Sequence, residues 1–103
     1  MWAQLITARL KAGSEAKVAT LLAQLEASEQ PGSGLVRSTA MLDQGDPLQL
    51  SVLVMFESEE HARAREKDER RGEALADARA TMAEIFDGPP EFQDLNVVGE
   101  FVP

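Results

Sequence analysis

The chain has 103 residues, of which 44% are hydrophobic and 27% are charged, a composition typical of one globular domain spanning residues 1–103. Its formal net charge of −8 argues against a nucleic-acid partner, because phosphate binding requires clustered, uncompensated cations. The absence of cysteine and the single histidine exclude disulfides, thiolate catalysis and a multi-histidine metal site within one copy.

The N-terminal part of the chain predicts a strand followed by a helix. Residues 2–11 alternate, so one strand face carries Trp2, Gln4, Ile6, Ala8 and Leu10. The other face carries Ala3, Leu5, Thr7 and Arg9, and neither face is fully polar. Ser14 then caps a helix that runs to about Glu29, with an apolar stripe at Val18, Leu21, Leu22 and Leu25.

Residues 35–43 and 48–57 predict two strands of a hairpin. The connection, residues 44–47, is short and contains Gly45. The second strand is apolar on both faces: alternate residues from Leu48 to Phe56 form one face, and Leu53 and Met55 lie on the other. An antiparallel strand of this kind requires cover on both sides.

A strongly charged helix is predicted after the hairpin, with Ser58 as its N-cap. Residues 59–71 contain equal numbers of acidic and basic side chains. The balance favours a solvated helix laced with i,i+3 and i,i+4 ion pairs, and the alternative is an arginine cluster that faces an anionic ligand. Gly72 is expected to separate this helix from a second one over residues 73–86, and a last strand is predicted over residues 92–102.

The element order β-α-β-β-α-β predicts an α+β, ferredoxin-like fold, in which a four-stranded antiparallel sheet carries helices on one face. The other face, with Leu5, Leu53 and Met55, is then apolar and uncovered. We expect a second copy to cover it, so that a homodimer encloses a barrel-like core. In that interface Arg9 and Arg37 are expected to pair with acidic residues such as Asp43, Asp94 or Glu100.

Three sequence features resemble the dimeric α+β barrel superfamily, and in particular its antibiotic-biosynthesis-monooxygenase-like members. In the first, a strand that ends with an aromatic residue leads directly into the start of a helix, in the segment Val54-Met55-Phe56-Glu57-Ser58-Glu59-Glu60. The opening strand ends in Ala8-Arg9-Leu10-Lys11-Ala12-Gly13 directly before an amphipathic helix, and Gly34-Leu35 begins the second strand. The resemblance spans nearly the whole chain.

The resemblance implies an oxygenase that acts on a hydrophobic aromatic or quinone-type molecule without a bound cofactor or metal, in a pocket between the sheet and the second helical region. The haem-degrading members use an Asn, a Trp and a His, and Ala8, Phe56 and an early His61 stand near those positions here, which argues against haem degradation. The chain has no Tyr, and its only Trp and Asn are Trp2 and Asn96, unlike the polyketide oxygenases. The alternative is a non-enzymatic dimer that binds a small ligand or serves in assembly.

Five residues are candidates for such a site. His61 and Arg65 are the candidate catalytic residues, since His61 is the one side chain expected to titrate near neutrality. Trp2, Phe56 and Met82 are candidates for the pocket lining, although ordinary core packing is the favoured explanation for Phe56 and Met82, and core or interface packing is the commoner role of a strand Trp. The longest apolar run, Val52 to Phe56, is too short to span a membrane or to form a signal-peptide core, so a cytoplasmic protein is expected.

Overall fold

One antiparallel sheet of four strands forms one layer of the computed structural model, which describes residues 1–103. The strands are β1 (Trp2–Arg9), β2 (Leu35–Leu42), β3 (Gln49–Phe56) and β4 (Glu91–Asn96), in the order β2-β3-β1-β4. β2 and β3 form a hairpin, whereas β1 pairs with β3 and β4, which are both distant along the chain. This topology confirms the predicted α+β, ferredoxin-like fold.

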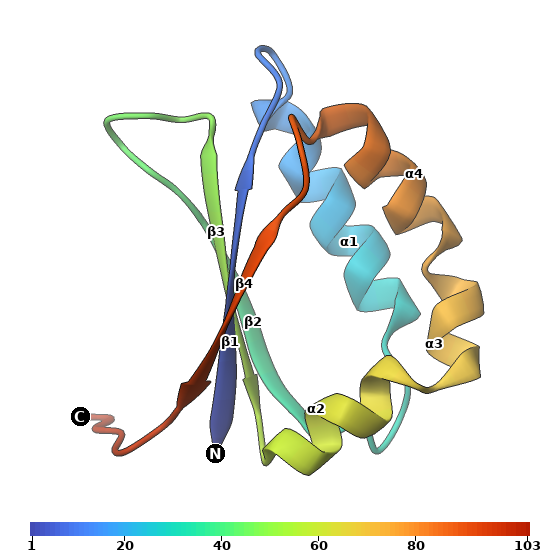
Figure 1. Cartoon of the computed structure of the whole chain (residues 1–103), viewed down its shortest axis with the longest axis vertical. Helices are drawn as coiled ribbons and strands as arrows, with labels where there is room; N and C mark the ends of the chain where they lie inside the picture. The colour runs from blue at the N-terminus through green and yellow to red at the C-terminus, as the bar shows by residue number, and fades with distance from the viewer.

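All helices lie on one face of the sheet (Figure 1). The first helical segment begins as a 3-10 turn, η1 (Glu15–Lys17), and continues as α1 (Val18–Ser28). The second comprises α2 (Glu59–Glu66), α3 (Glu69–Ala74) and α4 (Ala76–Ile85). None of these helices combines the length and apolarity that crossing a membrane requires.

The prediction that Gly72 divides the second helical region is wrong. Gly72 lies inside α3, and the chain breaks instead at Lys67–Asp68 and at Leu75. Asp68 adopts an extended conformation, and its carboxylate accepts a hydrogen bond from the backbone N–H of Arg70 at 3.0 Å. This cap starts a new helix, whereas glycine inside a helix only weakens it, by about 1 kcal/mol.

The strand registers separate the side chains of the sheet into two sets. Residues that lie opposite each other in an antiparallel pair share a face, so Trp2, Val54 and Asp94 all face the helices. A β-bulge between Leu35 and Arg37 shifts β2 by one residue. The strand predicted to reach residue 102 ends at Asn96, because Asn96 pairs with Trp2 and β1 begins there.

Two hydrophobic clusters fill the two ends of the space between the layers. The larger lies under α1 and α4 and contains Leu10, Val18, Leu21, Leu50, Leu75, Ala78 and Ile85. The smaller lies under α2 and contains Trp2, Val54, Phe56 and Ala62. Val52 is partly buried and packs against both clusters, so it marks the middle of the sheet wall.

The opposite face of the sheet, called the open face below, carries no helix (Figure 1). It presents Ala3, Leu5, Leu53, Met55 and Leu95. Arg9 pairs with Asp46, and Arg37 lies 3.7 Å from Glu100, so both arginines already have acidic neighbours within one chain. Asp94 is on the helix side of the sheet, which removes it from the partners expected for a sheet-to-sheet interface.

Candidate functional site

A cavity of about 800 Å³ lies between the sheet and the helices. It is lined by 27 residues, 18 of them hydrophobic, from all four strands and from α1 to α4. It separates the two hydrophobic clusters, and Val52 and Ile6 form part of its sheet wall. The helical layer bends around this space at the breaks between α2, α3 and α4 (Figure 1). A volume of this size accommodates a small organic molecule.

An aromatic pair closes one end of the cavity. The ring centroids of Trp2 and Phe56 lie 6.0 Å apart at an angle of 46°. Each ring carries a guanidinium over its face: Arg63 lies 5.1 Å from the Trp2 ring, and Arg65 lies 5.3 Å from the Phe56 ring. Aromatic faces attract cations, so this end presents flat apolar surface held in place by charged groups from α2.

Arg65 links α2 to the end of α1 through Glu29. Its Nε and Nη2 atoms donate hydrogen bonds of 2.8 to 3.0 Å to both carboxylate oxygens of Glu29. Both side chains are largely buried, at 15% and 20% exposure. Burial opposes ionisation of Glu29, but the hydrogen bonds from Arg65 and Ser33 prevail and lower its pKa. Glu29 is therefore a poor proton acceptor.

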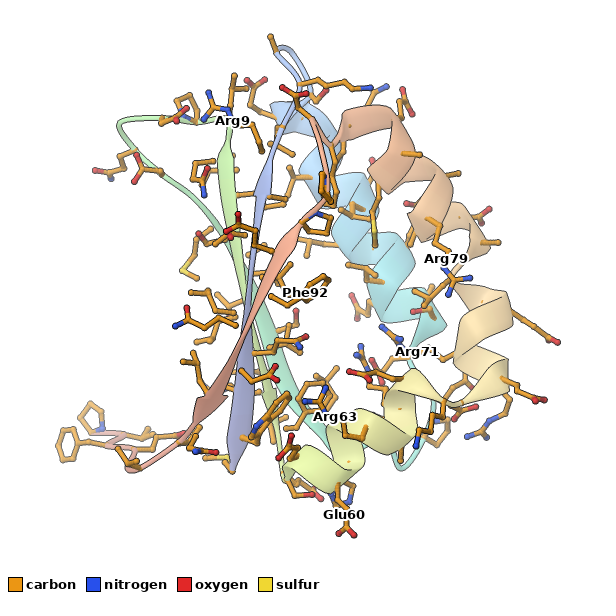
Figure 2. All side chains as sticks on the ribbon, in the orientation of Figure 1. Arg9, Glu60, Arg63, Arg71, Arg79 and Phe92 are labelled. Atoms are coloured by element: carbon orange, nitrogen blue, oxygen red, sulfur yellow. The ribbon has the colours of Figure 1, made fainter.

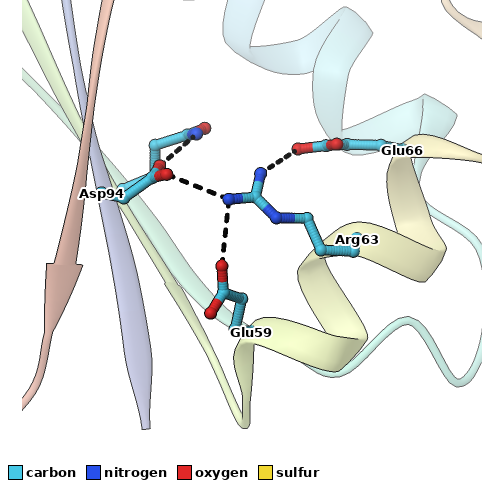
Figure 3. A network of polar contacts seen from close by, with 5 residues as sticks. Glu59, Arg63, Glu66 and Asp94 are labelled. Atoms are coloured by element: carbon cyan, nitrogen blue, oxygen red, sulfur yellow. Dashed lines mark hydrogen bonds and ion pairs between the residues drawn. The ribbon is translucent and has the colours of Figure 1, made fainter.

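Arg63 joins α2 to the edge strand β4. Its guanidinium donates to Glu59 and Glu66 on its own helix, each at 3.1 Å, and to Asp94 on β4 at 2.9 Å (Figure 3). Gln4 donates to the same Asp94 at 3.1 Å. The hydrogen bonds from Gln4 and from Arg63 lower the pKa of Asp94, and Asp94 and then Glu59 raise the pKa of Arg63. Both shifts favour the charged forms of Arg63 and Asp94.

The residues predicted from the sequence divide between the cavity and the surface next to it. Trp2, Phe56, Met82 and Arg65 line the cavity. His61 does not: it belongs to the first turn of α2, where its Nδ1 lies 2.6 Å from Ser58 Oγ and its Nε2 lies 3.5 Å from Glu57. His61 lines a shallow depression next to residues 29–33 instead. The structure thus places the two predicted catalytic residues, His61 and Arg65, on one helix but only Arg65 at the cavity.

Phe92 and Arg71 are two of the lining residues that were not among the predicted site residues. Phe92 of β4 points toward the helices, although its side chain is still 61% exposed (Figure 2). Arg71 of α3 lines the cavity from the opposite side. The orientation of Phe92 toward the helices follows from the alternation of β4 once the register of that strand is known. The one sequence feature that includes Arg71 is the balanced charge of residues 59–71. That balance does not show which arginine of the segment remains without an acidic partner.

The lining chemistry is that of a binding site for a largely apolar molecule. No group of three or more His, Cys, Asp or Glu side chains is positioned to hold a metal ion. The polar side chains of the lining include Gln4, Ser38, Arg65 and Arg71. The site can therefore position a flat apolar body against the sheet and contact its oxygen atoms with amide, hydroxyl and guanidinium groups.

No family model matches the sequence. No curated protein matches it either. Solved structures do match. A protein proposed to be an antibiotic biosynthesis monooxygenase, from Nitrosomonas europaea, has a TM-score of 0.74 and 14% identity, covering 96% of this chain and 100% of that one. A protein with the same proposed assignment from Bordetella bronchiseptica has a TM-score of 0.75 and 18% identity, covering 94% of this chain and 96% of that one.

A protein of unknown function from Nitrosomonas europaea has a TM-score of 0.70 and 25% identity, covering 99% of this chain and 93% of that one. These structures extend over nearly the whole chain, as the resemblance of the sequence motifs does. At these identities the similarity concerns the fold. The chain therefore has the ferredoxin-like α+β fold of the antibiotic-biosynthesis-monooxygenase-like proteins.

Proposed function

We propose that the protein binds a hydrophobic aromatic or quinone-type small molecule in the cavity and oxygenates it without a cofactor. The observation that carries the proposal is the cavity itself, about 800 Å³ of mostly apolar space with the Trp2–Phe56 pair at one end. The match to structures proposed to be monooxygenases supports the choice of reaction. Fold alone does not determine function, so the reaction needs its own test.

The proposed chemistry uses the substrate as its own reductant. An acidic C–H between two aromatic rings loses its proton, and the resulting carbanion transfers electrons to O₂ to give a hydroperoxide. Loss of water then leaves a ketone, so that one O₂ becomes the new carbonyl oxygen and one H₂O. The cavity contributes orientation and exclusion of water, and a nearby guanidinium stabilises the oxyanion form of the carbanion.

The roles predicted for His61 and Arg65 remain predictions. Arg65 lies at the cavity with its charge beside Phe56, which supports an electrostatic role toward a substrate oxyanion. His61 lies outside the lining, so a role as general base requires the proton to pass between the cavity and the first turn of α2.

The second candidate function is ligand binding without chemistry. The observation that favours it is the pairing of two of the three lining carboxylates: Glu29 is held by Arg65 and Glu66 by Arg63, which leaves Glu26 as the lining carboxylate without an ion pair. The hydrogen bonds from Arg65 and Ser33 lower the pKa of Glu29, so Glu29 is a weak proton acceptor. The same cavity serves both candidates, and only the reaction separates them.

Binding is tested with N-phenyl-1-naphthylamine, a neutral aromatic probe that fluoresces in apolar surroundings. Val52→Phe places a larger ring at the middle of the sheet wall and is expected to weaken probe binding about tenfold or more. Ala80→Phe adds the same ring to an exposed position of α4 outside the cavity and serves as the control. Unchanged probe affinity in Val52→Phe would contradict the assignment of the cavity as the binding site.

The reaction is tested by O₂ uptake and anthraquinone formation with anthrone as the substrate. The wild-type protein is expected to exceed the uncatalysed oxidation, and Val52→Phe is expected to lose that excess because the added ring occupies the middle of the sheet wall, where the substrate would lie. Arg65→Met and His61→Ala then report on the two predicted catalytic residues. Tight binding of anthrone with oxidation no faster than in buffer would reject the oxygenase and leave ligand binding as the function.

A further inference from the structure

Arg71 is the arginine of the cavity lining whose guanidinium has no hydrogen-bond or ion-pair partner. Its Nε is buried and has no hydrogen-bond partner, and its guanidinium takes part in no ion pair. The other buried polar atom without a partner, Oε1 of Gln24, belongs to a residue that does not line the cavity. A buried donor without a partner is costly, and in native proteins it often marks a functional group.

The other arginines of the chain all have polar partners. Five are paired with carboxylates: Arg9, Arg37, Arg63, Arg65 and Arg70. Arg79, which also lines the cavity, donates to the backbone oxygen of Gly72. Arg71 is thus the exception in a chain with a large excess of acidic residues. Its lack of a carboxylate partner is a property of this position and does not reflect a shortage of acids.

The carboxylates of the cavity lining do not supply Arg71 with an ion-pair partner. Burial and then the charge of Arg65 lower the pKa of the Arg71 guanidinium, and Arg79 acts in the same direction, whereas Glu29 and Glu66 act against this shift. Glu29 and Glu66 already accept hydrogen bonds from other arginines, and the third lining carboxylate, Glu26, forms no ion pair. An anionic group on a ligand would give the Arg71 guanidinium the acceptor that the protein does not supply.

We infer that the ligand of the cavity is an acid, with an anionic oxygen that binds to Arg71 and an apolar aromatic body that extends along the sheet wall. The inference rests on the proposed binding of a hydrophobic molecule in this cavity. It adds that this molecule carries a negative charge. Arg71 reaches from α3 toward the space between the layers, and Phe92 points into the same space from β4 (Figure 2). A planar guanidinium with parallel donors suits a carboxylate or an ionised phenol.

The test compares two probes with the same aromatic framework. N-phenyl-1-naphthylamine is neutral, and 1-anilinonaphthalene-8-sulfonate adds one anionic group. Arg71→Met keeps an unbranched apolar side chain that reaches about as far as the arginine Nε, and it removes the charge and the donors. It is expected to raise the Kd of the sulfonate probe about tenfold or more while the Kd of the neutral probe stays within about twofold. Arg71→Lys retains the charge without the forked donors and is expected to give an intermediate loss.

Arg70→Met is the matched control. Arg70 lies on the same helix, is paired with Asp68 and does not line the cavity, so this variant changes the net charge equally. The inference is overturned if Arg71→Met leaves the sulfonate affinity unchanged, or if Arg70→Met lowers it as much. Binding of the neutral probe shows that each variant is folded. Failure of the neutral probe to bind the wild-type protein would instead reject the proposed function.

A second pair of ligands distinguishes the two kinds of acid. 2-Naphthoate is ionised throughout the neutral range, whereas the phenol 2-naphthol becomes ionised only as the pH approaches the region of about 10 that is usual for phenols. For a carboxylate, the Kd ratio between Arg71→Met and wild type is expected to be constant with pH. For a phenol that Arg71 binds as an anion, that ratio is expected to grow as the pH rises. A ratio near one for both ligands at every pH would overturn the inference.

Discussion

The Glu29–Arg65 pair shows how one ion pair sets the position of several elements. Arg65 uses two of its nitrogen atoms on Glu29 and places its charge over the Phe56 ring. The pair therefore ties the end of α1 to α2 and holds α2 over the aromatic end of the cavity. Because both side chains are largely buried, the pair is worth more than a surface salt bridge.

Replacing Glu29 by Gln is expected to lower the free energy of unfolding at neutral pH by about 1–2 kcal/mol, because Arg65 loses a charged acceptor. Urea denaturation measures the change. The matched control is Glu26→Gln, on the same helix, because Glu26 has no hydrogen bond or ion pair from its side chain. An equal loss in both variants would contradict the role assigned to Glu29.

The Glu29 pair also predicts a pH dependence. The folded-state pKa of Glu29 lies below its unfolded value, so its contribution to stability is complete above the unfolded pKa of about 4. The contribution is lost as the pH falls through the folded-state pKa. The difference in unfolding free energy between wild type and Glu29→Gln is therefore expected to shrink on acidification. A difference that is constant or grows toward low pH would show that another group is responsible.

Alternation along the strands was enough to predict which apolar side chains share a face, and the structure places Trp2, Phe56 and Met82 at the cavity. It was not enough to identify Arg71. Which arginine lacks a partner depends on the break at Asp68, since that break turns α3 relative to α2. The partner of Asp94 was missed for a related reason: the register of β4 sets its face, and that register depends on pairing with residues more than 80 positions away.

At the scale of elements, the junction between β2 and α2 is the tightest contact that involves glycine. Gly34 has φ of +78°, a conformation that L-residues rarely adopt, and its backbone oxygen accepts from Glu57 N at 2.9 Å. A Cβ atom at Gly34 would overlap the His61 ring. The start of β2 and the first turn of α2 are thus in direct contact. His61 acts here as a packing residue, whatever its role in the reaction.

Replacing Gly34 by Ala is expected to destabilise the protein by more than the same change at Gly32. Gly32 has a similar φ of +77° but no atom within 4 Å of the added Cβ, so Gly32→Ala measures the backbone strain alone, about 1 kcal/mol. Adding His61→Ala to Gly34→Ala is expected to recover part of the difference, because it removes the ring but keeps the Cβ of residue 61, which also lies close to the added atom. Thermal unfolding of the three variants and of His61→Ala alone tests this. Equal effects at Gly32 and Gly34 would show that the His61 ring moves aside freely.

At the scale of the whole molecule, the sheet has one face covered by helices and one open face. We propose that a second copy covers the open face, so that the protein is a homodimer. Leu5, Leu53 and Met55 remain only partly buried in a single chain, and the residues after Asn96 leave further apolar side chains, Val98 and Phe101, exposed. An exposed apolar area of this kind is usual at interfaces and a hazard elsewhere.

Light scattering coupled to size exclusion is expected to give twice the mass of the 11.2 kDa chain. Leu53→Glu places a charge at the centre of the open face and is expected to give the monomer, because burial of an unpaired charge in the interface is costly. Ala80→Glu introduces the same charge on α4 and is expected to leave the dimer intact. A wild-type mass equal to that of one chain at micromolar concentration would reject the dimer.

The alternation of the strands gives the two faces separate sets of residues. In β1 and β3 the even-numbered side chains line the cavity, and the odd-numbered side chains lie on the open face. A substitution at one of these positions therefore directly changes either the cavity lining or the open face, but not both. Selection could therefore alter the cavity through every second codon of these strands and leave the contacts of the proposed dimer unchanged.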